Sequence, residues 1–97
     1  MSQLRELLGA LPTICFAVQA RAEPGVMPRV LELFARRNLL PSHVHATLVG
    51  PARDELHIDI QIDGLDPPLA DHIARCLRQI ADVEIVLTSE KCYAQTA

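Results

Sequence analysis

The sequence contains very few aromatic side chains. Two Phe and one Tyr occur in 97 residues, and Trp is absent. Small sheet proteins that read RNA stack its bases on aromatic side chains, so this composition argues against that class. Because 49% of the residues are nevertheless hydrophobic, the core must be built from Leu, Ile, Val and Ala. A core this modest often gains stability when chains associate.

Excess positive charge and long hydrophobic runs are also missing. The formal net charge is −3, which argues against nucleic acid or an anionic membrane as a partner, because both attract basic surfaces. No run of about 20 apolar residues is present, as a transmembrane helix would require. The first residues, MSQLRE, do not resemble a secretory signal. We therefore expect a cytoplasmic protein.

Cysteine is scarce and widely spaced. Cys15, Cys76 and Cys92 form no C-x-x-C pair, which predicts reduced thiols rather than a disulfide framework or a zinc site. No set of catalytic side chains emerges either: Ser42 and His43 are neighbours, but no carboxylate is positioned beside them by the sequence. We expect neither enzymatic activity nor a cofactor.

Hydrophobic spacing alternates between strand-like and helix-like periods. The order of the segments is βαββαβ, which predicts an α+β, ferredoxin-like, two-layer sandwich with two helices on one face of a four-stranded antiparallel sheet. Asp66 suits the start of the second helix because prolines follow it. The predicted strands are 13–21, 43–49, 56–63 and a last one marked by Val83, Ile85 and Leu87, and the predicted helices are 26–38 and 67–80.

Alternation in the second and third strands predicts which side chains face the helices. In the second strand, Val44, Ala46 and Leu48 are expected to point inward. The opposite face should be at least partly wet, because the third strand places polar side chains there. Parity puts four potential metal ligands on that face: His43, His45, His57 and Asp59. Such residues suit Zn²⁺ but equally suit a solvated or interface surface, and the sequence leaves both interpretations open.

The predicted domain spans residues 13–88, between an N-terminal extension and a tail. In the extension, residues 1–12, a stripe of Leu4, Leu7, Leu8 and Leu11 follows helical spacing. This stripe either covers the chain's own core or docks on a partner subunit. Residues 89–97 are expected to form a flexible tail.

The first strand and helix carry a family likeness. Residues 16–38, FAVQARAEPGVMPRVLELFARRN, resemble the opening of an ACT domain, in which a strand leads through x-Pro-Gly into a helix of the form x-Leu-x-x-Val-x-x-x-Phe. The likeness extends over residues 13–88. Within the family, Glu23-Pro24-Gly25 and Arg29-Val30 are similar to the first loop and helix of the small regulatory subunit of acetolactate synthase, and residues 77–83 resemble its second helix.

The resemblance implies regulation rather than catalysis. ACT domains typically form homodimers through an edge strand and bind an amino-acid effector between the first loop of one chain and the second strand of the other. A valine-like effector and a large thiamine-diphosphate-dependent catalytic subunit are the implied partners. The matching effector positions are Glu23, Pro24, Gly25, Val26 and Met27 in the loop and Ser42, His43, Val44 and His45 in the strand.

The loop also has physical features that suit a ligand, with one departure from the family pattern. Gly25 permits close approach of a ligand to the backbone, and the N–H groups of Val26 and Met27 open a helix, which favours a carboxylate. Effector-binding members usually carry Asn or Asp where this chain has Ala22. Alanine cannot hydrogen-bond an amino group. Two hypotheses therefore stand: an amino-acid sensor, and a dimerisation module that binds no effector.

Overall fold

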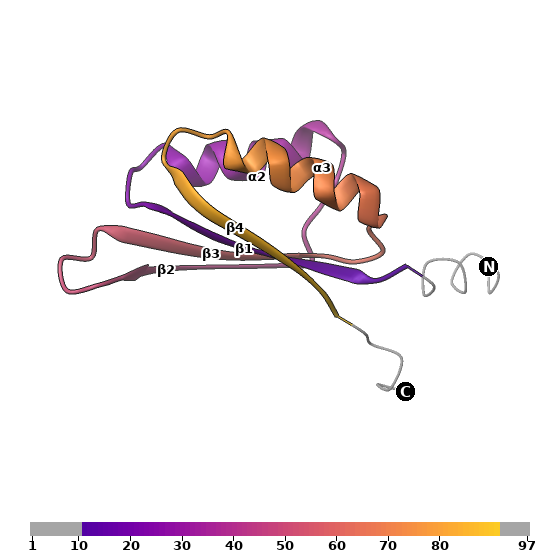
Figure 1. The fold of residues 1–97 in the computed structure, drawn as a ribbon, viewed down its shortest axis with the longest axis horizontal. Coiled ribbons are helices and arrows are strands. Elements are labelled where there is room, and N and C mark those ends of the chain that lie inside the picture. Colours follow the sequence, from indigo (N-terminus) through magenta and orange to yellow (C-terminus); the bar gives the residue numbers. More distant parts are fainter. Residues whose placement is uncertain (1–10, 92–97) are drawn as a thin grey trace.

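A computed structural model describes residues 11–91 of the chain. The elements are β1 (Thr13–Arg21), α2 (Val26–Arg36), β2 (His43–Val49), β3 (Glu55–Ile62), α3 (Pro67–Arg78) and β4 (Val83–Lys91). The sheet has the strand order β2-β3-β1-β4, each strand antiparallel to its neighbours, and both helices lie over one face (Figure 1). The predicted ferredoxin-like βαββαβ sandwich is confirmed. The Leu stripe of the N-terminal extension, apart from Leu11, lies outside the described residues.

The core forms where the two central strands meet the helices. Alternate residues of β1 lie opposite alternate residues of β3, and both sets are buried beneath the helices. The rings of Phe16 on β1 and Phe34 on α2 pack edge to face, with centroids 5.3 Å apart. The buried strand residues are Ile14, Phe16, Val18 and Ala20 on β1 and Leu56, Ile58, Ile60 and Ile62 on β3.

Local sequence explains where the helices begin and end. Helix α3 begins as predicted, with Asp66 at the N-cap and prolines in its first turn. Helix α2 ends at Arg36, two residues before the predicted end, because Asn38 adopts a left-handed backbone (φ 60°) and the N–H of Leu39 bonds back to the carbonyl of Phe34 at 2.9 Å. Neither helix within residues 11–91 has the length and hydrophobicity needed to cross a membrane.

Strand β4 is longer than predicted and shifts phase. It continues to Lys91, so residues 89–91 are strand rather than tail, because Ser89 pairs with Cys15 and Lys91 with Thr13. The register shifts opposite Gln19 and Ala20, as at a β-bulge. As a result Val83 and Val86 are buried, whereas Ile85 and Leu87, which belong to the same predicted strand as Val83, are exposed.

The side chains of β2 that were expected to point inward do face the helices, but they are not covered by them. Val44, Ala46 and Leu48 do lie on the helix side, since they pair with buried residues of β3. All three are nevertheless exposed. Strand β2 is an outer strand of the sheet, whereas α3 packs on β4 and β1 and the ring of Phe34 in α2 lies against β1. The alternation gave the correct face, but the helices leave this strand uncovered.

A part-buried polar contact joins the start of β1 to the residue that follows β3. The hydroxyl of Thr13, whose residue is 4% exposed, donates a hydrogen bond of 2.9 Å to the carboxylate of Asp63. Replacing Thr13 with Val should lower the free energy of unfolding by about 1 kcal/mol, measured by urea denaturation. Thr88→Val, at an exposed position, is the matched control and should change it by less than about 0.5 kcal/mol. Equal effects of the two substitutions would contradict this role of Thr13.

Candidate effector site and edge strand

The loop between β1 and α2 is exposed except where it enters the helix. Glu23, Pro24 and Gly25 are exposed, Met27 is half-buried, and Val26 is fully buried in the core. The N–H of Val26 donates to the carbonyl of Glu23 at 3.1 Å. Binding a carboxylate through this N–H would therefore require opening the turn, whereas Met27 lies in the first helical turn, where N–H groups have no intrahelical acceptor.

Gly25 has room above it rather than an unusual backbone. Its φ of −81° is one that any residue adopts. A Cβ built there would meet only the guanidinium of Arg29, at 3.8 Å from Cζ, which is an ordinary contact distance. The fold therefore tolerates a side chain at this position, and the space above Gly25 is bordered by a cation.

Arg29 was not among the predicted site residues. Its Nη1 lies 3.9 Å from a carboxylate oxygen of Asp82, in a partly solvated ion pair beside the loop. A guanidinium next to a helix start is well suited to bind the carboxylate of an amino acid. The sequence did contain a signal, because Arg29 follows Gly25 by four residues and so lies one helical turn above it.

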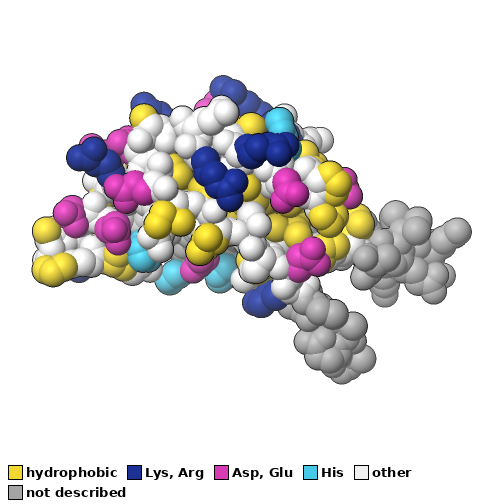
Figure 2. All heavy atoms as spheres, viewed as in Figure 1, with side chains coloured by type: hydrophobic (Ala, Val, Ile, Leu, Met, Phe, Trp, Pro, Cys, Tyr) yellow, Lys and Arg dark blue, Asp and Glu magenta, His cyan; other side chains and the backbone are white. Residues whose placement is uncertain are grey.

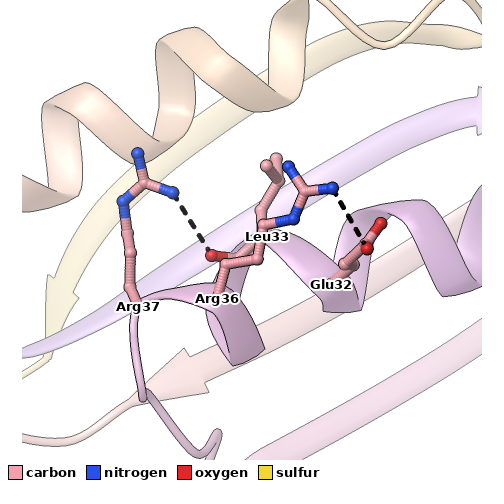
Figure 3. A network of polar contacts seen from close by, with 4 residues as sticks. All are labelled: Glu32, Leu33, Arg36 and Arg37. Carbon is pink, nitrogen blue, oxygen red and sulfur yellow. Dashed lines mark hydrogen bonds and ion pairs between the residues drawn. The ribbon is translucent and has the colours of Figure 1, made fainter.

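Arg36, the last residue of α2, and Arg37, which caps the helix, are held by contacts with the same helix. Arg36 forms an ion pair with Glu32 at 3.2 Å, and Arg37 donates to the carbonyl of Leu33 at 3.4 Å (Figure 3). Arg37 also lies 3.9 Å from the sulfur of Cys76 on α3. These contacts explain why the two arginines belong to the surface of the helix layer rather than to the loop.

The second half of the predicted site lies on the outer strand β2. Its first residues, His43, Val44 and His45, are exposed. Just before the strand, the N–H of Ser42 donates to the carbonyl of Gln61 at 2.8 Å and its hydroxyl to the same oxygen at 3.3 Å. These bonds fix the start of β2 against β3, and the strand's other edge faces away from the sheet.

Within one chain the two halves of the predicted site lie at opposite ends of the sheet. His43 pairs with Gln61, which in turn pairs with Cys15 near the start of β1. The loop lies at the far end of the sheet, where Glu55 of β3 pairs with Val49 of β2 on one side and Arg21 of β1 on the other. There the N–H of Ala22 donates to the carbonyl of Asp54 at 3.0 Å. The structure therefore does not bring Glu23–Met27 and Ser42–His45 of one chain together.

The histidines of β2 and β3 form a polar surface. His43 and His45 stack with ring centroids 6.5 Å apart, and Nε2 of His57 lies 3.1 Å from a carboxylate oxygen of Glu55. Figure 2 shows histidine side chains along the lower side of the molecule, away from the helices, with acidic side chains between them. No group of three or more His, Cys, Asp or Glu within residues 11–91 is arranged to hold a metal ion.

The strand order and the placement of the helices define a ferredoxin-like domain with an uncovered outer strand. A family model described as an ACT-like domain matches residues 10–94. The chain therefore belongs to the ACT-like domain family. No curated protein matches its sequence.

Solved structures share the fold at low sequence identity. The C-terminal domain of the MgtC protein from Mycobacterium tuberculosis aligns with a TM-score of 0.67 and 15% identity, over 90% of this chain and 95% of that one. The ACT domain of GTP pyrophosphokinase from Chlorobium tepidum aligns with a TM-score of 0.67 and 8% identity, over 79% of this chain and 96% of that one. The regulatory subunit of aspartate kinase from Thermus flavus aligns with a TM-score of 0.59 and 12% identity, over 80% of this chain and 51% of that one.

Proposed function

We propose that this domain is a non-catalytic regulatory module that pairs with a second copy of itself through β2 and senses an amino acid at the junction. The observation that carries the proposal is the exposure of β2, where Val44 and Leu48 are 43% and 41% exposed although they face the helix side. An outer strand with exposed apolar side chains is a template for pairing with another strand. Pairing would cover these side chains.

A two-fold arrangement about Ala46 suits the strand. The seven residues His43–Val49 are centred on Ala46, so an antiparallel pair about this residue overlaps along its whole length. Val44 would then lie opposite Leu48 of the second copy, and the small Ala46 would meet its own copy at the axis. Apolar cross-strand pairs of this kind stabilise sheets, and two-fold interfaces use the same patch twice.

The same pairing would complete the effector site. Because the strands run antiparallel, Ser42–His45 of the second copy would lie at the end of the sheet that carries the loop Glu23–Met27. Arg29 offers a guanidinium for the effector's carboxylate, exposed Glu23 a carboxylate for its ammonium group, and half-buried Met27 an apolar contact. These three groups match a small apolar amino acid such as valine.

The regulated enzyme follows from the resemblance in the loop and helices. We propose a large thiamine-diphosphate-dependent subunit of acetolactate synthase as the partner. Purified domain added to such a large subunit should make its activity sensitive to valine. Activity and valine sensitivity that are the same with and without the domain would contradict this choice of partner, and would leave the dimer and its effector site untouched.

A ligand-free assembly module is the second candidate. Ala22 presents no polar side chain, and the N–H groups of Ala22 and Val26 already bond to the carbonyls of Asp54 and Glu23. Thermal unfolding with millimolar valine, leucine or isoleucine separates the candidates. A ligand at 100 times its Kd adds about 2.7 kcal/mol, which is several degrees in Tm for a domain this size. An intact dimer that shows no shift would favour the assembly module.

Replacing Gly25 with Val tests the loop directly. The added side chain should abolish the valine-induced rise in Tm, because it fills the space between the backbone and Arg29. The dimer and the Tm without ligand should persist, since a Cβ there meets nothing closer than 3.8 Å. Ala35→Val, which adds the same group on the exposed side of α2, is the control and should keep the shift. An unchanged shift in the Gly25 variant would overturn the loop assignment.

A further inference from the structure

The face of the sheet opposite the helices is divided into a polar half and an apolar half. Strands β2 and β3 place histidines and acidic residues there. On β1 and β4 the same face carries Ala17 paired with Leu87, next to Gln19 paired with Ile85. Ile85 and Leu87 are 45% and 60% exposed. We call this surface, made of Cys15, Ala17, Ile85 and Leu87, the apolar half-face.

The dimensions of the apolar half-face fit a single helix better than a folded partner. It is two strands wide, and neighbouring strands lie about 4.8 Å apart. A helix with its side chains is about 10 Å across and so covers two strands. Stable interfaces between folded proteins bury about 800 Å² on each partner, far more than two half-exposed side chains supply. Polar β3 borders the half-face and limits its extension.

The chain itself supplies a segment of matching length and character. Leu4, Leu7, Leu8 and Leu11 follow helical spacing immediately before β1. As a helix, the stretch from Leu4 to Leu11 would be about 10 Å long. The half-face runs from Cys15 to the row of Gln19, about 13 Å along β1. The leucine stripe and the half-face are therefore close to equal in length.

The point where the chain enters the sheet places this segment within reach. The carbonyl of Pro12 accepts the N–H of Leu65 at 3.1 Å, which anchors the chain just before Thr13 pairs with Lys91. The row of Cys15 and Ser89 lies only two residues further along β1. A reversal at Leu11 and Pro12 would therefore return the segment over the half-face, antiparallel to β1.

We propose that the leucine stripe of residues 4–11, a segment that lies outside the described residues apart from Leu11, docks on the apolar half-face of the same chain. The family model begins at residue 10, so this cover is an addition to the shared fold. It lies over β1 and β4, whereas the proposed dimer forms through β2 at the opposite edge. The two proposals are therefore independent of each other.

Cys15 reports on this cover because its thiol belongs to the half-face. The test uses the full chain and measures the rate at which iodoacetamide alkylates Cys15, by mass spectrometry. The double substitution Leu7→Glu/Leu8→Glu should raise this rate about tenfold, because it removes a local protecting contact. Cys76, in the helix layer, should react at an unchanged rate and so excludes general unfolding. Ser2→Glu/Gly9→Glu adds the same charge off the stripe and should leave both rates as in the parent protein.

A second substitution tests the surface from the other side. Leu87→Glu should speed the alkylation of Cys15 as well, and should add little when combined with Leu7→Glu/Leu8→Glu, because both disrupt one contact. Equal Cys15 rates in the parent protein and the leucine variant would overturn the proposal. Protection of Cys15 that fades on dilution would also overturn it, since it would assign the cover to a second copy.

Discussion

Replacing Phe16 with Ala should lower the free energy of unfolding by about 3–5 kcal/mol. The ring is fully buried at the centre of β1 and packs edge to face on Phe34 with centroids 5.3 Å apart. The truncation leaves a cavity in the core, and its surroundings relax only partly to fill it. Domains are commonly stable by only about 5–15 kcal/mol, so this single change should remove a large share of the stability, as measured by urea denaturation followed by circular dichroism.

The matched control is Leu40→Ala, because Leu40 is 88% exposed. Its truncation should change the free energy of unfolding by less than about 0.5 kcal/mol. A Phe16→Ala variant that lost less than about 1 kcal/mol would contradict the arrangement of the core, in which α2 is fastened to β1 through these rings.

The double substitution Val44→Lys/Leu48→Lys should convert the proposed dimer to a monomer. Both side chains would be covered in the paired state, and burying two ammonium groups without partners is strongly unfavourable. Lysines on outer strands are also a common device against strand pairing. The monomer should remain folded, since both positions are exposed within one chain. Sedimentation velocity and circular dichroism measure the two properties separately.

The control for this variant carries lysines on the other outer strand. Glu84→Lys/Thr88→Lys on β4 should leave the sedimentation coefficient of the dimer unchanged, because both residues are exposed and lie far from β2. The monomeric β2 variant should also lose the valine-induced rise in Tm, since Ser42–His45 of the second copy complete the site. A rise that survives in the monomer would mean that the effector binds within one chain. A parent protein that sediments as a monomer would refute pairing altogether.

The sequence alone determined the elements and their order. Alternation in β1 and β3 and the apolar stripes of both helices follow from local geometry, so residues such as Phe16, Ile58 and Val30 could be assigned to the core before any contact was known. The start of α3 at Asp66 and Pro67 is equally local. The loop Glu23–Met27 was located by the same means, because a Pro-Gly pair between a strand and a helix needs no tertiary information to be recognised.

Only the tertiary structure decided what lies beside what. The exposure of Val44 and Leu48 depends on how far the helices extend across the sheet, and the exposure of Ile85 and Leu87 depends on a register shift opposite Gln19. Neither exposure follows from the alternation within a single strand, because that alternation shows which face of the sheet a side chain lies on but not what covers the face. The separation of the loop from Ser42–His45 likewise follows from the antiparallel pairing of both β1 and β2 with β3, which is a property of the assembled sheet.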